Sequence, residues 1–535
     1  MRKFFIKLYK FLTSLNKLEI LLITLGFVIS TFLLSVFAVY SFEKIISKEN
    51  KIKNGGILIE GLYQEIETLN PFLVNNNAEK TIVNLIFDSL VRTDGNGNYE
   101  FELAKDIKEI DNGLKYEIEL RDDIYWSNGS RITSEDVINT FEYLNKLSNN
   151  YLQDYFSKIK IEKLDNKKIL FTLPKKDNLF IQKLSEIKII PSGVWSKYKI
   201  EDFKNKNELI KISSGPYFLS NEIIKDNIVI YEFSKNKFYY PKPHLEKIYI
   251  YVFKDIKTAY YALKTKKINS LGGLQPNYFE DNLSKEFKII SIVLPRVVAI
   301  FFNSKKIPSN LNIEDLNKSL NKNELTKEVF SRYAENTDYF FSTSLQNLFV
   351  NFSNKNENQN IELTKTTTTK DYEDLKNEKK DIKFENIELT VPDSFLFNKM
   401  ANYLQANLGL KIILKSITEI NKKIIPNKEY QALLYGISFN LNPNLKIFFE
   451  ENSVFNLTNS NNDEIIKTIQ DIEIGDKKEI YNNYLKLNKQ ISKLPIVFLM
   501  NPYYIYIVPK NLNIDIKYLN DSSERFVKIE NWYFE

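Results

Sequence analysis

The alternation of hydrophobic and polar positions predicts a series of short strands in the first half of the chain. These segments are rich in β-branched and aromatic residues and are bounded by Gly, Pro, Asn or Asp, which is typical of β-strands. They span residues 57–59, 115–120, 168–173, 227–233 and 248–253. A longer apolar run at residues 297–303 predicts a further strand.

Helical spacing appears between these strands. In residues 135–147 the apolar positions recur at the interval of an amphipathic helix. These positions are Val137, Ile138, Phe141, Leu144 and Leu147. Thr133 or Ser134 is expected to cap this helix, with Asp136 in its first turn. Residues 258–264, 395–408 and 476–491 also predict helices. The expected fold class is therefore mixed α/β.

The N-terminal segment has a different pattern. Residues 20–42 contain no charged side chain, and at about 1.5 Å per residue they could span the hydrocarbon core of about 30 Å. Five basic residues precede the run, which predicts a cytoplasmic N-terminus at residues 1–19 and an extracytoplasmic chain after the linker 43–54. A cleaved signal peptide is the alternative, which the length of the run and the poor cleavage site at residues 35–41 disfavour.

Composition narrows the possible functions. A chain of 535 residues with 43% hydrophobic residues is expected to form two or three folded domains. Residues 1–54 contain nine Lys or Arg and three Asp or Glu, which accounts for the whole net charge of +6. The remainder is neutral, with 65 residues of each sign, so we expect no nucleic-acid partner.

The chain has no Cys and a single His, which removes several chemistries. Disulfides, thiolate zinc sites and Cys nucleophiles lack their Cys, and a Ser-His-Asp triad would depend on the single His. His244 follows two prolines and is expected to be an ordinary loop residue. We therefore expect no metal site, no cofactor and no catalytic residue.

An ordered set of short motifs points to a known family. Gly55-Gly56, Thr68-Leu69-Asn70-Pro71, Ile86-Phe87-Asp88-Ser89-Leu90 and Trp126-Ser127-Asn128-Gly129 follow one another before the helix at 135–147. This order resembles the extracellular solute-binding proteins that supply peptides and nickel to ABC importers. The resemblance covers residues 55–300 and 387–535. Many members are held by a lipid on a Cys, which this chain lacks, so the helix at 20–42 would be the tether.

The resemblance implies a two-lobed, periplasmic-binding-protein-like fold of type II, cluster C, preceded by one transmembrane helix. The first lobe would comprise residues 55–87, 191–295 and 485–535, with an extra subdomain at 88–190. The second lobe would comprise residues 296–484, with a helix at 314–330 and a polar loop at 351–383.

The resemblance also implies where a ligand would bind. Two segments and one basic residue are expected at the cleft: Asn75, Asn76, Asn77, Ala78 and Glu79; Arg296; and Tyr435, Gly436, Ile437, Ser438, Phe439 and Asn440. Peptide-binding relatives have an Asp near Asn440 that can pair with the peptide ammonium. Because Asn440 carries no charge, we expect free-amine peptides to bind weakly, or the ligand to be another polar molecule.

The expected function is a membrane-anchored solute-binding protein that captures oligopeptides or a similar polar solute and delivers them to ABC permease subunits. It would act as a monomer at the cell membrane. Two alternatives stay open: a tethered receptor or scaffold with a degenerate cleft, and an extracellular hydrolase using two carboxylates. No spacing of Asp and Glu singles out such a pair, so we expect no enzyme.

Overall fold

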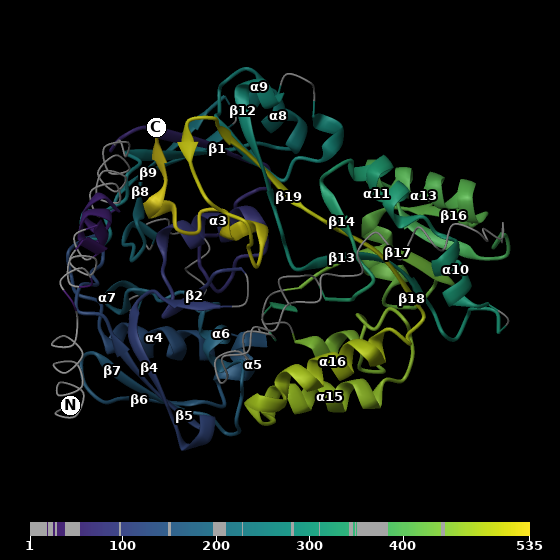
Figure 1. Ribbon diagram of the computed structural model, residues 1–535, viewed down its shortest axis with the longest axis horizontal. Helices are drawn as coiled ribbons and strands as arrows, with labels where there is room; N and C mark the ends of the chain where they lie inside the picture. Colours follow the sequence, from purple (N-terminus) through teal and green to yellow (C-terminus); the bar gives the residue numbers. More distant parts are fainter. Residues whose placement is uncertain are drawn as a thin grey trace.

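The computed structural model describes most of the chain after residue 53. The described residues are 54–95, 98–147, 151–195, 210–226, 228–279, 283–309, 311–341, 346, 347, 349, 383–439 and 444–535, preceded by 16, 19, 25, 26 and 29–37. They form two lobes that each contain a large mixed sheet, and a smaller sheet adjoins the first lobe (Figure 1). Asn440 and the polar loop at 351–382 lie outside the described residues.

The first lobe is built on a seven-stranded sheet. Its order is β12 (Phe287–Ile292), β19 (Tyr504–Pro509), β11 (Ser270–Gly272), β1 (Ile57–Leu62), β10 (Lys247–Val252), β9 (Ile228–Lys235) and β8 (Tyr217–Lys225). Strand β1 pairs in parallel with both neighbours. Its side chains are buried on two sides, because Leu58 belongs to the core around α3 (Asn77–Ile86), whereas Ile59 packs against the core that includes α8 (Ile256–Lys264).

A four-stranded antiparallel sheet fills much of residues 88–190. Its order is β4 (Ala104–Ile110), β5 (Lys115–Leu120), β7 (Lys168–Thr172) and β6 (Lys160–Lys163). The helices of this region are α4 (Ser134–Asn145), α5 (Tyr151–Phe156), α6 (Phe180–Leu184) and α7 (Ser192–Trp195). Ile118 and Phe171 of this sheet share one continuous hydrophobic core with Leu58 and Ile248 of the larger sheet.

Two short antiparallel strand pairs complete the first lobe. Strand β2 (Val91–Thr93) pairs with β3 (Tyr99–Phe101), and β20 (Leu512–Asn513) pairs with β21 (Tyr533–Phe534). A short helix, α9 (Leu283–Glu286), precedes β12. Near this C-terminal pair, the single histidine, His244, accepts a backbone bond from Gly55 and contacts Asn54 at 2.9 Å through its ring. The described residues contain no cluster of three or more metal-ligating side chains.

The second lobe is a helix–sheet–helix sandwich. Its sheet has the order β14 (Ala334–Asn336), β18 (Ile496–Pro502), β13 (Arg296–Phe302), β17 (Ala432–Ser438), β15 (Glu388–Pro392) and β16 (Lys411–Lys415). One face packs on α10 (Ile313–Ser319), α11 (Lys322–Phe330) and α13 (Phe395–Leu408). The other face packs on α15 (Asp463–Ile474) and α16 (Ile480–Ile491). A short helix, α14 (Ile417–Glu419), follows β16.

Strand β13 lies in the middle of this sandwich, which explains its sequence. Ile300 and Phe302 point to the face with α11 and α13, whereas Ala299 and Phe301 point to the face with α15 and α16. Because both faces are buried, successive positions are all apolar and no alternation is seen. The predicted strand at 297–303 is confirmed with a shift of one residue.

The chain passes between the lobes at two adjacent connections. Residues 293–295 join β12 of the first lobe to β13 of the second, and Tyr503 joins β18 to β19 (Figure 1). The predicted return to the first lobe at residue 485 is therefore wrong. Helix α16 packs on α15, and β18 pairs with β13, so residues 485–502 belong to the second lobe.

Two other predicted helices illustrate how local signals decide boundaries. The helix at 395–408 is confirmed, and Gly409 ends it with φ 72°, which favours glycine. The helix at 314–330 is wrong as a single element. It breaks at Leu320, whose extended backbone precedes Asn321, and the Asn321 side chain caps α11 by accepting a bond from the Glu324 N–H.

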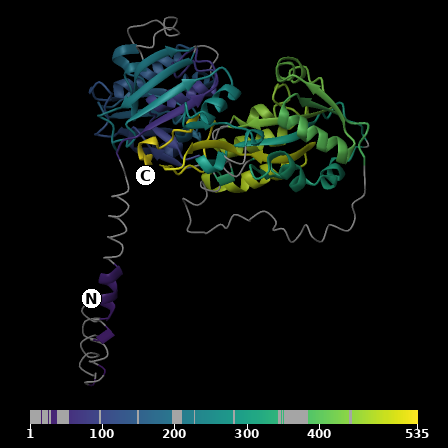
Figure 2. The same ribbon diagram turned by 90° about the horizontal axis from the view of Figure 1, so that it is seen from above.

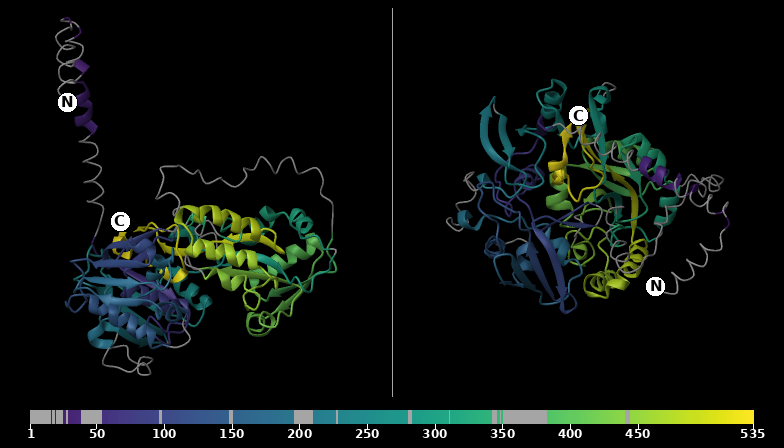
Figure 3. Two further views of the ribbon diagram at one scale, coloured as in Figure 1. Left: turned by 90° about the horizontal axis from the view of Figure 1, so that it is seen from below. Right: turned by 60° about the vertical axis from the view of Figure 1, so that its left-hand side comes forward.

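The described N-terminal residues lie apart from the two lobes. Residues 29–37 are helical, and Phe32, Leu33, Leu34 and Phe37 are each more than 60% exposed (Figures 2 and 3). No helix among the described residues combines the length and hydrophobicity needed to cross a membrane. About half of the predicted anchor at 20–42 lies outside the described residues, so it stays a prediction.

Candidate functional site

A cavity of about 310 Å³ lies where the two lobes meet, beside both connections. The first lobe supplies residues 273–276, which follow β11, and the start of β19. The second lobe supplies the start of β13, the end of β17 and the first turns of α13. A ligand here would touch both lobes at once, which is the requirement for a solute that stabilises a closed arrangement.

A second groove, of about 630 Å³, does not have this property. It lies on the second lobe alone and contains Lys415, Glu419, Lys423 and Glu429. These charges form pairs with each other, Lys415 with Glu419 at 2.9 Å and Lys423 with Glu429 at 3.7 Å. The described residues that line this groove all come from the second lobe, so a ligand there would not touch both lobes, and the interlobe cavity is the stronger candidate.

Arg296 is the charged residue of the interlobe cavity. It is the first residue of β13, and its Nε donates a hydrogen bond of 2.6 Å to the carbonyl of Pro502, the last residue of β18. Burial lowers the pKa of its guanidinium to about 10, against the opposing influence of Tyr504, Asp521 and Tyr63. Arg296 therefore remains a cation at neutral pH, and it is held by the crossing strands themselves.

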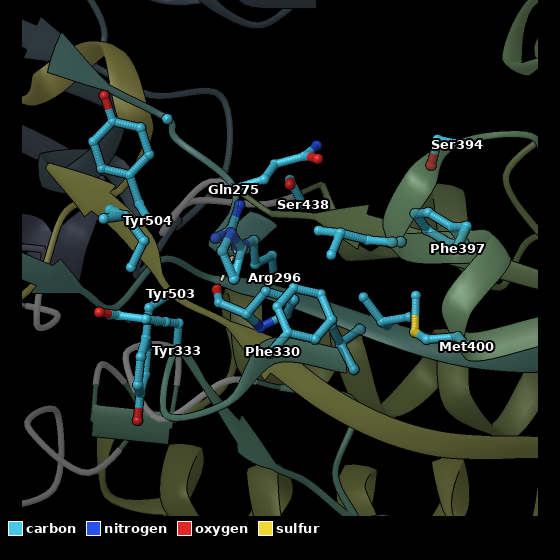
Figure 4. Close-up of a pocket in the computed structure, with 18 of the residues that line it drawn as sticks. Gln275, Arg296, Phe330, Tyr333, Ser394, Phe397, Met400, Ser438, Tyr503 and Tyr504 are labelled. Carbon is cyan, nitrogen blue, oxygen red and sulfur yellow. Dashed lines mark hydrogen bonds between the residues drawn. The ribbon is translucent and has the colours of Figure 1, made fainter. Parts of the chain in front are cut away.

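The walls of the cavity are mostly apolar. Figure 4 shows Arg296 beside Gln275 and Ser438 at one end, with Phe397 and Met400 of α13 toward the other end. Phe330, Tyr333, Leu396 and Tyr503 contribute further apolar surface. The arrangement offers one positive charge, a few hydrogen-bonding groups and a large apolar wall, which is the usual composition of a small-molecule site.

Two glycines allow the first lobe to approach the cavity closely. A Cβ on Gly272 would lie 1.8 Å from the hydroxyl oxygen of Tyr504, and a Cβ on Gly273 would lie 2.2 Å from that of Tyr63. Gly273 also has φ +81°, a conformation that side chains disfavour. The end of β11 therefore requires glycine at both positions if the two tyrosines are to keep their places.

A buried ion pair lies next to Tyr504 in the first lobe. Arg525 and Glu60 lie 2.9 Å apart and are 5% and 0% exposed, and the Tyr506 hydroxyl donates to Glu60 at 3.0 Å. Burial raises the pKa of Glu60, although Arg525 and hydrogen bonds from Ser270, Arg525 and Tyr506 oppose this rise. The Arg525 guanidinium also lies 5.4 Å from the centre of the Tyr504 ring. This network fixes the first-lobe wall of the cavity.

The predicted contact segment at residues 75–79 does not line the cavity. It forms the start of α3, where the Asn76 side chain accepts bonds from Ala78 and Glu79 as an N-cap. The buried carboxylate of Glu79 accepts bonds from the N–H groups of Glu67, Thr68 and Asn75, at 2.7, 3.0 and 2.7 Å. Asn77 donates to Ser522, and Ala78 is buried. These groups hold α3 in place in the structure, and their contact with a ligand stays a prediction.

The second predicted segment divides between cavity and core. Gly436, Ile437 and Ser438 line the cavity together with Arg296. Tyr435 instead donates to Asn421 at 2.7 Å, and Phe439 packs in the core of the second lobe. Asn440 lies outside the described residues. Contact of any of these residues with a ligand stays a prediction.

Several cavity residues were not predicted from the sequence. Gln275, Tyr333, Phe397 and Tyr503 come from four segments that are far apart in the chain. The one available signal was the position of Tyr503 between two apolar runs that form β18 and β19. In this Tyr- and Phe-rich chain, no sequence pattern separates the other aromatic residues of the cavity from those of the core.

Comparison with known proteins identifies the family. The profile of "Bacterial extracellular solute-binding proteins, family 5 Middle" matches residues 98–452. The oligopeptide-binding protein AppA of Bacillus subtilis is 26% identical over 262 residues, which cover 48% of this chain and 48% of that protein. The chain therefore spans about half of the length of the curated relatives that it matches.

Solved structures share the fold over almost the whole chain. The structure of AppA from Bacillus subtilis with a nonapeptide has a TM-score of 0.66 at 20% identity, and covers 90% of this chain and 100% of its own. NikZ from Campylobacter jejuni with Ni(L-His) has a TM-score of 0.64 at 21% identity, and covers 89% and 99%. The predicted two-lobed, mixed α/β fold is confirmed by these similarities. Because the family profile matches more than half of the sequence, the chain belongs to the bacterial extracellular solute-binding proteins of family 5.

Proposed function

We propose that the protein is the extracytoplasmic solute-binding component of an ABC importer, which captures a peptide or a similar polar solute and delivers it to permease subunits. The observation that carries this proposal is the interlobe cavity, whose walls come from both lobes. Relatives support the class of solute, since AppA is named as oligopeptide-binding and was solved with a nonapeptide. NikZ, solved with Ni(L-His), extends the range to small chelates.

The protein would work by a shift of population between open and closed arrangements. The two connections at residues 293–295 and Tyr503 are the hinge, because they are the covalent links between the lobes. A solute that contacts Arg296 and Ser438 of the second lobe together with Gln275 of the first would favour the closed arrangement. The permease would then recognise that arrangement. No step requires covalent chemistry.

We further propose that residues 20–42 form a single transmembrane anchor, with residues 1–19 in the cytoplasm and the lobes outside as a monomer. The uncharged run and the basic residues before it support this orientation. The exposed apolar side chains of the helical residues 29–37 are suited to lipid. Protease treatment of intact cells should remove the lobes while leaving an N-terminal epitope tag protected. Release of intact lobes into the medium by cells that were not treated with protease would contradict a retained anchor.

A tethered receptor or scaffold is the second candidate. It is favoured by one observation: the described residues that line the cavity include no carboxylate to pair with a peptide ammonium. In this case the lobes would contact another envelope protein, and a solute would be irrelevant to the contact.

Native mass spectrometry of the full chain, purified gently in detergent from its own host, distinguishes the two. We expect bound masses, either a series of peptides or one small solute, that are lost after denaturation and refolding. Solution scattering of the refolded protein should then show a smaller radius when the recovered solute is added. A protein that carries no mass and does not contract with any recovered or synthetic solute would support the receptor.

A further inference from the structure

Arg296 has unused hydrogen-bonding capacity that faces the cavity. A guanidinium carries five N–H donors, and the bond to Pro502 occupies the one on Nε. In the part of the chain that the structure describes, neither Nη1 nor Nη2 has a protein acceptor, and no carboxylate lies within 4.0 Å. The planar fork formed by these two nitrogens matches the geometry of a carboxylate.

The other enclosed arginines provide a comparison within the same molecule. Arg525 pairs with Glu60 at 2.9 Å, and Arg92 pairs with Glu530 at 3.1 Å and with Glu100 at 3.3 Å. Both of these enclosed arginines therefore have carboxylate partners within the protein. A partly buried cation without an acidic partner within 4.0 Å is costly, and Arg296 lies in the interlobe cavity, whose described walls come from both lobes.

The remaining lining residues define the other end of a ligand. Arg296 is the single ionised side chain among the described residues that line the cavity. Gln275 and Ser438 offer polar atoms beside it, while Phe397 and Met400 form an apolar wall on α13 (Figure 4). At about 310 Å³, the cavity is at the lower end of the range for small-molecule sites, about 300 to 1,000 Å³.

From these observations we infer that the solute is a small monoanion, with one carboxylate held by the fork of Arg296 and an uncharged, apolar body against α13. This inference rests on the proposed function and specifies its substrate class. A zwitterion would be disfavoured, because the described residues that line the cavity offer its ammonium no counter-charge. The carboxylate could belong to a free organic acid or to the C-terminus of a short peptide whose amino group is blocked or lies outside.

Matched probes can test the charge requirement directly. We would titrate the full chain in detergent with N-acetylphenylalanine, its carboxamide, free phenylalanine and N-acetyl-diphenylalanine, using calorimetry. We expect N-acetylphenylalanine to bind at least about tenfold more tightly than the carboxamide, which corresponds to one charge-assisted bidentate contact. Free phenylalanine should bind more weakly than the acetylated form. Tighter binding of N-acetyl-diphenylalanine would indicate a peptide C-terminus, whereas weaker binding would indicate a free acid.

Variants of Arg296 assign the effect to this residue. Arg296→Gln should abolish the preference for the acid over the carboxamide, and Arg296→Lys should restore part of it. Arg131→Gln, on the exposed surface of the first lobe, should keep the full preference. Unchanged thermal unfolding would exclude a folding defect in Arg296→Gln. If Arg296→Gln were unstable, the test would rest on Arg296→Lys. Its ratio of affinities for the acid and the carboxamide should be smaller than that of the wild type, and an equal ratio would contradict the role of Arg296.

The outcomes separate this inference from the proposed function. Equal binding of acid and carboxamide, preference for free phenylalanine, or failure of all four probes would overturn the monoanion inference. In each of these cases, peptides or another solute recovered from the host with lobe contraction would leave the proposed function standing. The absence of any recovered solute and of any contraction would count against the importer itself.

Discussion

The side-chain amide of Asn178 donates a hydrogen bond of 3.1 Å to the carbonyl of Gly475, and so connects the lobes at a point away from the hinge. The same amide donates to Ile472 at 3.0 Å, and the backbone N–H of Asn178 donates to Glu473 at 2.9 Å. Asn178 therefore satisfies carbonyls at the C-terminal end of α15, where an intrahelical partner is lacking. Lys176 adds a bond of 2.7 Å to Gly475, which suits the negative end of the helix dipole.

Asn178→Ala should weaken this second contact between the lobes. Loss of the two side-chain bonds should shift the equilibrium toward the open arrangement by about 1 to 2 kcal/mol. We expect a larger radius of gyration in solution scattering and weaker solute binding. Asn482→Ala, on the exposed side of α16, is the matched control and should change neither. An unchanged radius for Asn178→Ala would show that this contact does not hold the lobes.

Arg525→Met should strongly destabilise the first lobe. It leaves the carboxylate of Glu60, which is 0% exposed, without its cation, and such a change costs about 3 to 5 kcal/mol. Urea unfolding monitored by Trp fluorescence would measure the loss. The double variant Glu60→Leu with Arg525→Met should recover part of it, because no unpaired charge remains. Lys160→Met, which removes an exposed pair with Glu162, should cost less than about 1 kcal/mol.

Glu524 should make stability depend on pH. Burial raises its pKa to about 7 from the ordinary 4.5, and Asp521 adds to the rise, although hydrogen bonds from Asn520 oppose it. The folded state therefore binds the proton more tightly than the unfolded state. Its stabilising contribution is complete below pH 4.5 and is lost as the pH rises through about 7.

Glu524→Gln removes this titration while keeping an acceptor for Asn520. Relative to the wild type, the variant should gain about 1 to 3 kcal/mol of unfolding free energy between pH 5 and pH 8. For Glu451→Gln, on an exposed turn, the difference in unfolding free energy from the wild type should stay the same between pH 5 and pH 8. If the difference in unfolding free energy between Glu524→Gln and the wild type were constant across this range, the raised pKa of Glu524 would be contradicted.

Glu79→Gln tests the role that the structure gives to the start of α3. Replacement of the carboxylate by an amide weakens three backbone hydrogen bonds and should cost about 1 to 3 kcal/mol of unfolding free energy. The affinity of the folded protein for its solute should be unchanged, since Glu79 does not line the cavity. The exposed Glu67→Gln serves as the control for stability. A selective loss of affinity would restore Glu79 as a ligand contact.

Local patterns predicted many of the elements, whereas long-range contacts decided the site. The helix at Phe395–Leu408 was predictable because its apolar spacing and Gly409 are local signals. The stretch at residues 75–79 looked like a polar contact loop, but its role depends on Glu67, Thr68 and Ser522, the last of which lies 445 positions from Asn77. The break at Leu320 was missed because apolar residues continue on both sides of it.

The segment 435–440 was placed at the cleft by resemblance, and Arg296 by its position at the entry to an apolar strand. Arg296 and Gly436–Ser438 line the cavity, whereas their contact with a ligand stays a prediction. The apolar wall on α13 and Gln275 could not be predicted in the same way. Their membership of the cavity depends on how the two sheets are set against each other across the hinge, and the pattern of a single segment contains no information on that arrangement.

The place of β19 in the first sheet affects the order in which the protein can be assembled. This strand is made after the whole second lobe, yet it lies between β11 and β12, which are made before that lobe. The second lobe is one continuous stretch, so it can fold while the first still has two unpaired strand edges. The lobe that begins first would thus be finished last, and the open edges of β11 and β12 would need protection from aggregation until β19 is made.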